Sequence, residues 1–218
     1  MRGKRGAGNQ RLILSTEERL RKDLIFINNP VFVEGLALAP VIAAAVTLRN
    51  ALMLCLMILL LIIPTRFFGN LLIGYIPQRL RAMVCAFMAC GFYIPGYLLL
   101  NLLFGIRVVN LGIYLPMLVV DSILISRTEI PNREPVAESL INGIRTALGF
   151  SVAVSLTGSV REILGFGSIW GIVIFERAPL PIITMAAGGF IAVALLCAVY
   201  QHFISITKRT VYRGDQRK

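Results

Sequence analysis

The chain has 218 residues, of which 57% are hydrophobic and only 15% charged, and its mean hydropathy is +0.79. A water-soluble domain of this size needs more polar surface than this composition supplies, so soluble enzymes and soluble binding modules are excluded. The formal net charge is +11, but the basic residues gather toward the two ends of the chain. That placement is typical of membrane insertion and contact with anionic lipid, so we expect a lipid bilayer as a partner and no nucleic acid.

Six apolar stretches are predicted to cross the membrane as helices, which makes the expected fold an all-α integral membrane protein. Residues 82–103 and 180–203 each exceed the roughly 20 residues that a span requires, and neither contains a charged side chain. The six predicted spans, in chain order, are 31–48, 51–63, 82–103, 108–125, 141–160 and 180–203. The second either stops at Pro64 or runs on to Phe68, with Arg66 at its end. The stretch 67–77, after the second span, is expected to lie in the membrane interface.

Basic residues orient the predicted spans. The expected domains are a basic N-terminal segment (1–30), a six-span membrane domain (31–203, with repeats at about 31–103 and 108–203) and a basic tail (204–218). An even number of spans leaves both tails on one side, together with five further basic residues: Arg66, Arg79, Arg81, Arg127 and Arg133. The opposite side receives Arg49, Arg107, Arg161 and Arg177. Because basic residues are retained in the cytoplasm, both termini are predicted to be cytoplasmic, in a bacterial or archaeal cytoplasmic membrane.

The first and fourth spans differ from the others, because each carries an acid and a proline. Glu34 and Pro40 lie in the first span, and Asp121 and Pro116 lie in the fourth. Each of these spans begins a group of three, and two groups of three insert in opposite senses. The pattern predicts two inverted repeats whose first helices are interrupted, with a working site where the interruptions meet.

Asp121 stands inside the apolar run LPMLVVDSILISRT, residues 115–128. Lipid penalises a charge, so its side chain is expected to face the protein interior beside an interrupted helix, where freed backbone amides stabilise it. Two roles stay open for it: an ion or proton ligand, or a cap of the half-helix that follows. His202 is the only histidine and has no second ligand at helical spacing, so no haem or metal site is predicted there.

Four blocks of the sequence carry a resemblance to a known family. They are NNPVFVEGLALAPVIAAA (28–45), RNALMLCL (49–56), LGIYLPMLVVDSILISRTE (111–129) and GSVREILGFGSIW (158–170). In residues and spacing they resemble the E-type membrane subunit of the Rnf complexes and the related D-type subunit of the Nqr complexes. The resemblance runs from Asn28 to about His202. It implies a subunit of a redox-driven pump that moves electrons between ferredoxin or NADH and a second carrier, coupled to Na⁺ or H⁺ movement.

The same resemblance implies a homologous partner subunit of opposite orientation (RnfA/NqrE type), further Rnf-type subunits, and a [2Fe–2S] cluster that the two homologues share. The positions that match the family's cysteines are Ala39 and Ser122 in this chain. Alanine cannot ligate iron, and a serine oxygen is a poor substitute for a thiolate, so we predict no cysteine ligand from this chain. We therefore predict that five residues form either an ion or proton site or a break in the helices: Asp121, Ser122, Ala39, Pro40 and Pro116.

Three classes of function stay open on the residues alone. They are a subunit of a redox complex, a stand-alone inverted-repeat transporter of an ion or small solute without redox chemistry, and a membrane scaffold that binds a small ligand or lipid. The family blocks favour the first class. In that class the chain is a component of a translocase and is not expected to be catalytic alone, and the residues leave its cofactor unknown.

Overall fold

The computed structural model describes residues 25–72, 75–128, 135–176 and 178–215, and this part of the chain is mostly helical. Most of the predicted basic segment 1–30, the end of the tail 204–218, and the loop residues Arg133 and Arg177 lie outside the described residues. The long helices are α3 (Leu48–Leu72), α4 (Arg81–Phe104), α7 (Val136–Phe166) and α8 (Ala186–Asp215). The short ones are α2 (Leu38–Ala44), α5 (Tyr114–Met117) and α6 (Ser122–Thr128).

Short 3₁₀ turns and one hairpin connect these helices. The 3₁₀ turns are η1 (Gln78–Leu80), η2 (Gly105–Leu111), η3 (Leu118–Val120) and η4 (Pro181–Thr184). The hairpin consists of strands β1 (Ser168–Ile169) and β2 (Ile172–Val173), which pair antiparallel.

Four helical segments are long and apolar enough to cross a membrane by length and composition. They are Leu48–Leu72, Arg81–Leu111, Val136–Phe166 and Ala186–Lys208. They coincide with the second, third, fifth and sixth predicted spans. The expectation of a helical, multi-pass membrane protein is therefore confirmed at this level.

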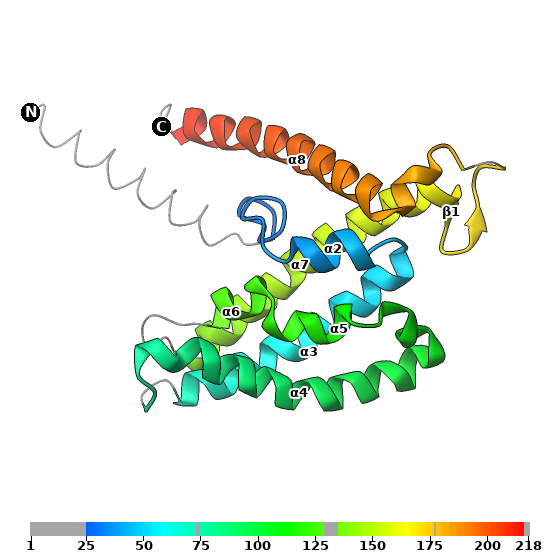
Figure 1. Ribbon diagram of the computed structural model, residues 1–218. Helices are drawn as coiled ribbons and strands as arrows, with labels where there is room; N and C mark the ends of the chain where they lie inside the picture. The colour runs from blue at the N-terminus through cyan, green and yellow to red at the C-terminus, as the bar shows by residue number, and fades with distance from the viewer. Residues whose placement is uncertain (1–24, 73–74, 129–134, 177, 216–218) are drawn as a thin grey trace, which may run out of the picture.

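Helices α3 and α7 form an antiparallel pair at the centre of the molecule. The Leu48 amide at the start of α3 bonds the Glu162 side chain near the end of α7, and Arg66 near the end of α3 bonds Ser139 near the start of α7. α4 packs beside α3, and α8 lies on the other side of the pair (Figure 1). Because α4 and α8 each bury little of their surface within the chain, their outer faces are left for lipid or a partner.

The second span is longer than either predicted end. α3 passes Pro64 and Phe68 and continues to Leu72, so residues 67–72 of the stretch expected in the interface belong to the same helix. Pro64 removes one hydrogen bond, which a membrane helix tolerates when neighbouring helices pack against it. Arg66 does not extend from the end of the span toward the membrane surface, because only 6% of it is exposed and its Nη1 donates to the Ser139 carbonyl at 2.9 Å.

The first and fourth predicted spans are interrupted, as expected. In the first, residues 31–37 form turns and only α2 is helical. In the fourth, α5 runs directly into η3, which ends just before Asp121. The backbone of Asp121 is extended, and α6 begins at the next residue. Pro40 and Pro116 each lie in the first turn of a short helix, where no backbone donor is required.

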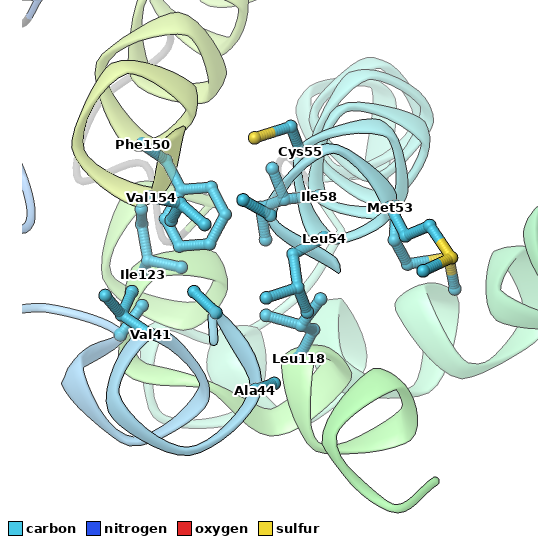
Figure 2. Packing of buried hydrophobic residues seen from close by; sticks show 14 of the residues in the cluster. Val41, Ala44, Met53, Leu54, Cys55, Ile58, Leu118, Ile123, Phe150 and Val154 are labelled. Atoms are coloured by element: carbon cyan, nitrogen blue, oxygen red, sulfur yellow. The ribbon is translucent and has the colours of Figure 1, made fainter. Parts of the chain in front are cut away.

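The hydrophobic core forms where the short segments meet the central pair. Most of its side chains come from α2, α3, η3, α6 and α7, with others from α4, η2, α5 and α8, and Figure 2 shows part of it in close contact. Labelled members are Val41, Ala44, Leu54, Ile58, Leu118, Ile123, Phe150 and Val154. The interrupted segments are thus packed parts of the fold.

Candidate functional site

The first interruption is a tight series of turns that ends in a left-handed residue. Gly35 has φ of +71° and Ala37 has φ of +57°, and Ala37 is the residue that precedes α2. A left-handed alanine costs roughly 1–2 kcal/mol, so the surrounding contacts must hold it in place.

Asn29 anchors these turns to the central pair. It is fully buried, and its Oδ1 accepts hydrogen bonds from the amides of Val31 at 3.0 Å and Phe32 at 3.2 Å. Its Nδ2 donates to the carbonyl of Gly149, in the middle of α7, at 2.8 Å. One amide side chain therefore satisfies turn amides on one side and fixes the segment to α7 on the other.

The second interruption is organised by Asp121, which is 8% exposed. Its Oδ1 accepts hydrogen bonds from the Ile123 amide at 3.2 Å and from the Ser122 hydroxyl at 3.1 Å. Its carbonyl accepts from the amides of Leu124 and Ile125, both at 3.1 Å. This is the geometry of a helix N-cap, so Asp121 caps α6. Capping was one of the two roles left open for this residue.

A hydrogen bond joins the two interruptions. The Ala37 amide donates to Ser122 Oγ at 3.2 Å, and Ser122 Oγ donates in turn to Asp121 Oδ1. The strained backbone of the first break is therefore tied through one hydroxyl to the carboxylate of the second. We call the unit formed by Ala37, Asp121 and Ser122 the junction.

The predicted site residues lie at different depths around this junction. Asp121 and Pro40 are buried, whereas Ser122, Ala39 and Pro116 are exposed. The Asp121–Ser122 pair lies close to the break that contains Ala39, because Ser122 accepts a hydrogen bond from Ala37, two residues before Ala39. Pro116 lies on α5, which packs against α2. The exposed face of the junction is not covered by the described part of this chain.

The residues at the junction do not fit a thiolate-bound iron–sulfur cluster. Ala39 offers only a methyl group, and the Ser122 hydroxyl already accepts one hydrogen bond and donates another. Cys55 lies elsewhere, on α3, with its sulfur 3.7 Å from the Ser151 carbonyl of α7. Within the described ranges no cluster of three or more histidine, cysteine, aspartate or glutamate side chains comes together.

Arg161 follows the fifth predicted span directly in the sequence, but in the structure it lies inside a long helix. It lies in α7, is fully buried, and donates only to backbone carbonyls among its described hydrogen bonds. Its acceptors are the carbonyls of Ile42, Ala45 (3.4 Å), Ile183 (3.1 Å), Thr184 (3.2 Å) and Met185 (3.5 Å). The guanidinium therefore joins the end of α2 to η4, the turn that precedes α8.

Glu162 completes the arrangement at the corner between α2 and α3. Its Oε2 accepts a hydrogen bond from the Leu48 amide, the first residue of α3, at 2.7 Å. A cation suits the carbonyl end of a helix and an anion suits the amide end, so Arg161 and Glu162 each match the helix terminus they contact. The signal was in the sequence: two adjacent charges in an apolar stretch must be hydrogen-bonded if lipid surrounds them.

Comparison with known proteins places these features in a family. Residues 19–197 match the model of the Rnf-Nqr family, described as an Rnf-Nqr subunit and membrane protein. Proteins named as the E-type subunit of an ion-translocating oxidoreductase complex, from Shewanella piezotolerans and Shewanella oneidensis, are each 33% identical over 144 residues, which is 66% of this chain and 62% of theirs. The protein of the same name from Shewanella denitrificans is 29% identical over 158 residues, which is 72% of this chain and 68% of the Shewanella denitrificans chain. The match to the first two thus spans under two thirds of their length.

Proposed function

This chain belongs to the Rnf-Nqr family of membrane proteins, and on that premise we propose that it is a membrane subunit of an ion-translocating oxidoreductase complex. In this proposal the complex couples electron transfer, linked to ferredoxin or NADH, to the movement of Na⁺ or H⁺. The relatives' names support the assignment, and the hydrogen bond from Ala37 to Ser122 is the structural observation that carries it. It joins two interrupted segments inside a membrane protein, which is an arrangement found at the working sites of ion-coupled proteins.

We propose that the chain crosses the membrane six times as two inverted repeats. The order of a broken segment followed by two long helices occurs twice, as α2, α3 and α4 and then as α5 to α6, α7 and α8. The antiparallel pairing of α3 with α7 supports an inverted relationship between the halves, since these helices hold equivalent places in them. Under the positive-inside rule both termini are then cytoplasmic.

A homologous membrane subunit is the proposed partner at the junction. Ser122 and Ala39 are exposed, although the residues directly beside them in the interrupted segments are buried or half-buried. Polar backbone at such an interruption needs a protein or water-filled environment, because lipid cannot satisfy it. A second subunit with interruptions at matching positions would cover this face.

At the junction we propose a hard-ligand site in place of metal–thiolate chemistry. Oxygen ligands from carboxylate, hydroxyl and backbone carbonyls suit Na⁺ or a proton better than iron. Both hydrogen bonds described for the Asp121 carboxylate go to Oδ1. The role of ion or proton ligand is thus compatible with the capping role.

The test is purification from native membranes through a tag at the C-terminus of the full chain. The proposal expects co-purification of a homologous membrane subunit and of subunits that carry redox cofactors, with NADH- or ferredoxin-dependent ion movement in vesicles. The competing proposal is a stand-alone transporter. It would be favoured by a stable, monodisperse chain that purifies alone and moves an ion or solute without any electron donor.

A further inference from the structure

The hairpin at the end of α7 is held rigidly to that helix. Strand residues Ser168 and Val173 pair, as do Ile169 and Ile172. The turn between the strands consists of Trp170 and Gly171, both with positive φ, as a tight two-residue hairpin requires. The carbonyl of Gly167, which directly follows α7, accepts hydrogen bonds from the amides of residues 174 and 175 at 2.8 and 2.9 Å. The segment 167–175, which we call the hairpin loop, is therefore a closed unit.

The surface of the hairpin loop is apolar on both faces. Ile172 and Val173 follow one another along a strand, so their side chains point to opposite faces, and each is 71% exposed. Residues 166–175 contain no charged side chain. Four further side chains in this stretch are about half exposed: Phe166, Trp170, Ile174 and Phe175. The hairpin loop projects from the end of α7 at the edge of the molecule (Figure 1).

The hairpin loop lies level with the ends of two long helices. It follows the last residue of α7, and the Arg49 guanidinium, in the first turn of α3, lies 5.4 Å from the centroid of the Trp170 ring. α3 and α7 are antiparallel, so the start of one and the end of the other mark the same side of the membrane. A tryptophan beside an arginine at that level is typical of the boundary between acyl chains and headgroups.

We propose that the hairpin loop is a membrane anchor that binds phospholipid at the bilayer surface opposite the predicted cytoplasmic side. Its apolar side chains enter the acyl boundary, and the Arg49–Trp170 pair lies at the level of the lipid phosphates. Lipid is the favoured occupant because the hairpin loop directly follows the half-exposed Phe166, the last residue of a helix that is long and apolar enough to cross a membrane. Lipid also covers both apolar faces of the loop, whereas a protein docked on one face would leave the other exposed.

Trp170 provides a specific probe, because it is the only tryptophan in the chain. The full chain would be reconstituted in vesicles of phosphatidylcholine and phosphatidylglycerol that contain lipids brominated either near the carbonyl end or near the methyl end of the acyl chain. The proposal expects the shallow bromine to quench Trp170 emission more strongly than the deep one. Quenching by aqueous iodide with none by either lipid would overturn it, and so would strongest quenching by the deep bromine.

Variants separate the hairpin loop from general lipid exposure. The double substitution of Ile172→Ser and Val173→Ser should reduce quenching by the shallow lipid and shift Trp170 emission to longer wavelength. Phe203→Ser changes a similarly exposed side chain near the far end of α8, so it should leave both signals unchanged. Equal effects of the two variants would contradict the proposal.

The assembled complex allows a direct choice between lipid and protein. Val173→benzoylphenylalanine in the full-length chain should form photo-crosslinks to phospholipid in native membranes. Crosslinking to another protein instead of lipid would overturn the anchor and identify the hairpin loop as a protein contact. Neither result alters the proposed redox function, because co-purification of cofactor-bearing subunits tests that function independently.

Discussion

The amide of Ala37 donates a hydrogen bond to the hydroxyl of Ser122 across 85 positions of sequence, at 3.2 Å. This bond joins the strained end of the first interrupted segment to the first residue of α6. Because the same hydroxyl donates to Asp121, the bond also sets the position of that carboxylate. The two halves of the chain are therefore coupled at the point where neither has a continuous helix.

Removing the Ser122 hydroxyl should destabilise the junction. Ser122→Ala leaves the Ala37 amide without its acceptor, a loss of about 1–3 kcal/mol in the free energy of unfolding when a buried donor is unsatisfied. Thermal unfolding in mild detergent measures the effect. Ser159→Ala is the matched control, since its hydroxyl bonds the Ser155 carbonyl of its own helix. Equal melting temperatures for the two variants would show that the junction bond contributes little.

Arg161 should be far less replaceable than an exposed arginine. Arg161→Met leaves the carbonyls at the end of α2 and in η4 without a cationic donor, and hydrogen bonds to charged groups contribute about 1.5–3 kcal/mol each. We expect a loss of roughly 3 kcal/mol or more, and Arg161→Lys should recover only part of it, because an ammonium cannot reproduce the guanidinium fork. Arg107→Met changes an exposed side chain and should leave the melting temperature nearly unchanged.

The close approach of α3 and α7 depends on glycine. A Cβ at Gly158 would lie 3.0 Å from Ala51 Cβ and 3.1 Å from the Thr47 carbonyl, so the two helices would have to separate. Gly158→Ala should therefore destabilise the protein by about 1–3 kcal/mol. Gly91→Ala, on α4, meets nothing within 4 Å and should be neutral or stabilise by about 0.5–1 kcal/mol. If unfolding shows the reverse order, the α3–α7 packing described above is wrong.

Hydropathy was sufficient to predict the long helices, because lipid imposes one simple requirement on length and polarity. It underestimated the length of the second span, which continues to Leu72, and it could not show that the Ser139 carbonyl of α7 accepts a hydrogen bond from Arg66. An acid with a proline correctly marked both interruptions, since an isolated charge in lipid needs freed backbone groups nearby. The partners of Arg161 were beyond sequence reasoning, because its acceptors are backbone carbonyls, which every residue carries.

The site residues show the same limit. Asp121 and Ser122 were singled out because polar side chains are costly in an apolar run, and both belong to the junction. Ala37 was not, since nothing in an alanine indicates a left-handed backbone or a distant acceptor. The Asp121 carboxylate caps α6 by accepting a hydrogen bond from the Ile123 amide, two residues along the chain. Because this contact is local, the sequence could suggest capping as one of two roles for Asp121.

The proposed topology predicts where reporters will be active. A cytoplasmic reporter fused after Lys218 should be active, because the basic tail is retained inside. The same reporter inserted at Gly171, in the hairpin turn, should be inactive there, whereas a periplasmic reporter at that position should be active. Periplasmic activity of the fusion at the C-terminus would reverse the assigned orientation.

The charge of Asp121 can be tested separately from its cap. Asn and Asp are about equally good N-caps, so Asp121→Asn should keep the bond from the Ile123 amide and leave the amount of assembled complex nearly unchanged. If the carboxylate is an ion or proton ligand, ion movement driven by electron transfer in vesicles should fall severalfold, because the amide cannot take up a proton or balance a cation. Asp121→Ala is the comparison, since it also removes the cap and should lower stability by about 1 kcal/mol. Full ion-linked activity in Asp121→Asn, together with a destabilised Asp121→Ala, would assign Asp121 to capping alone.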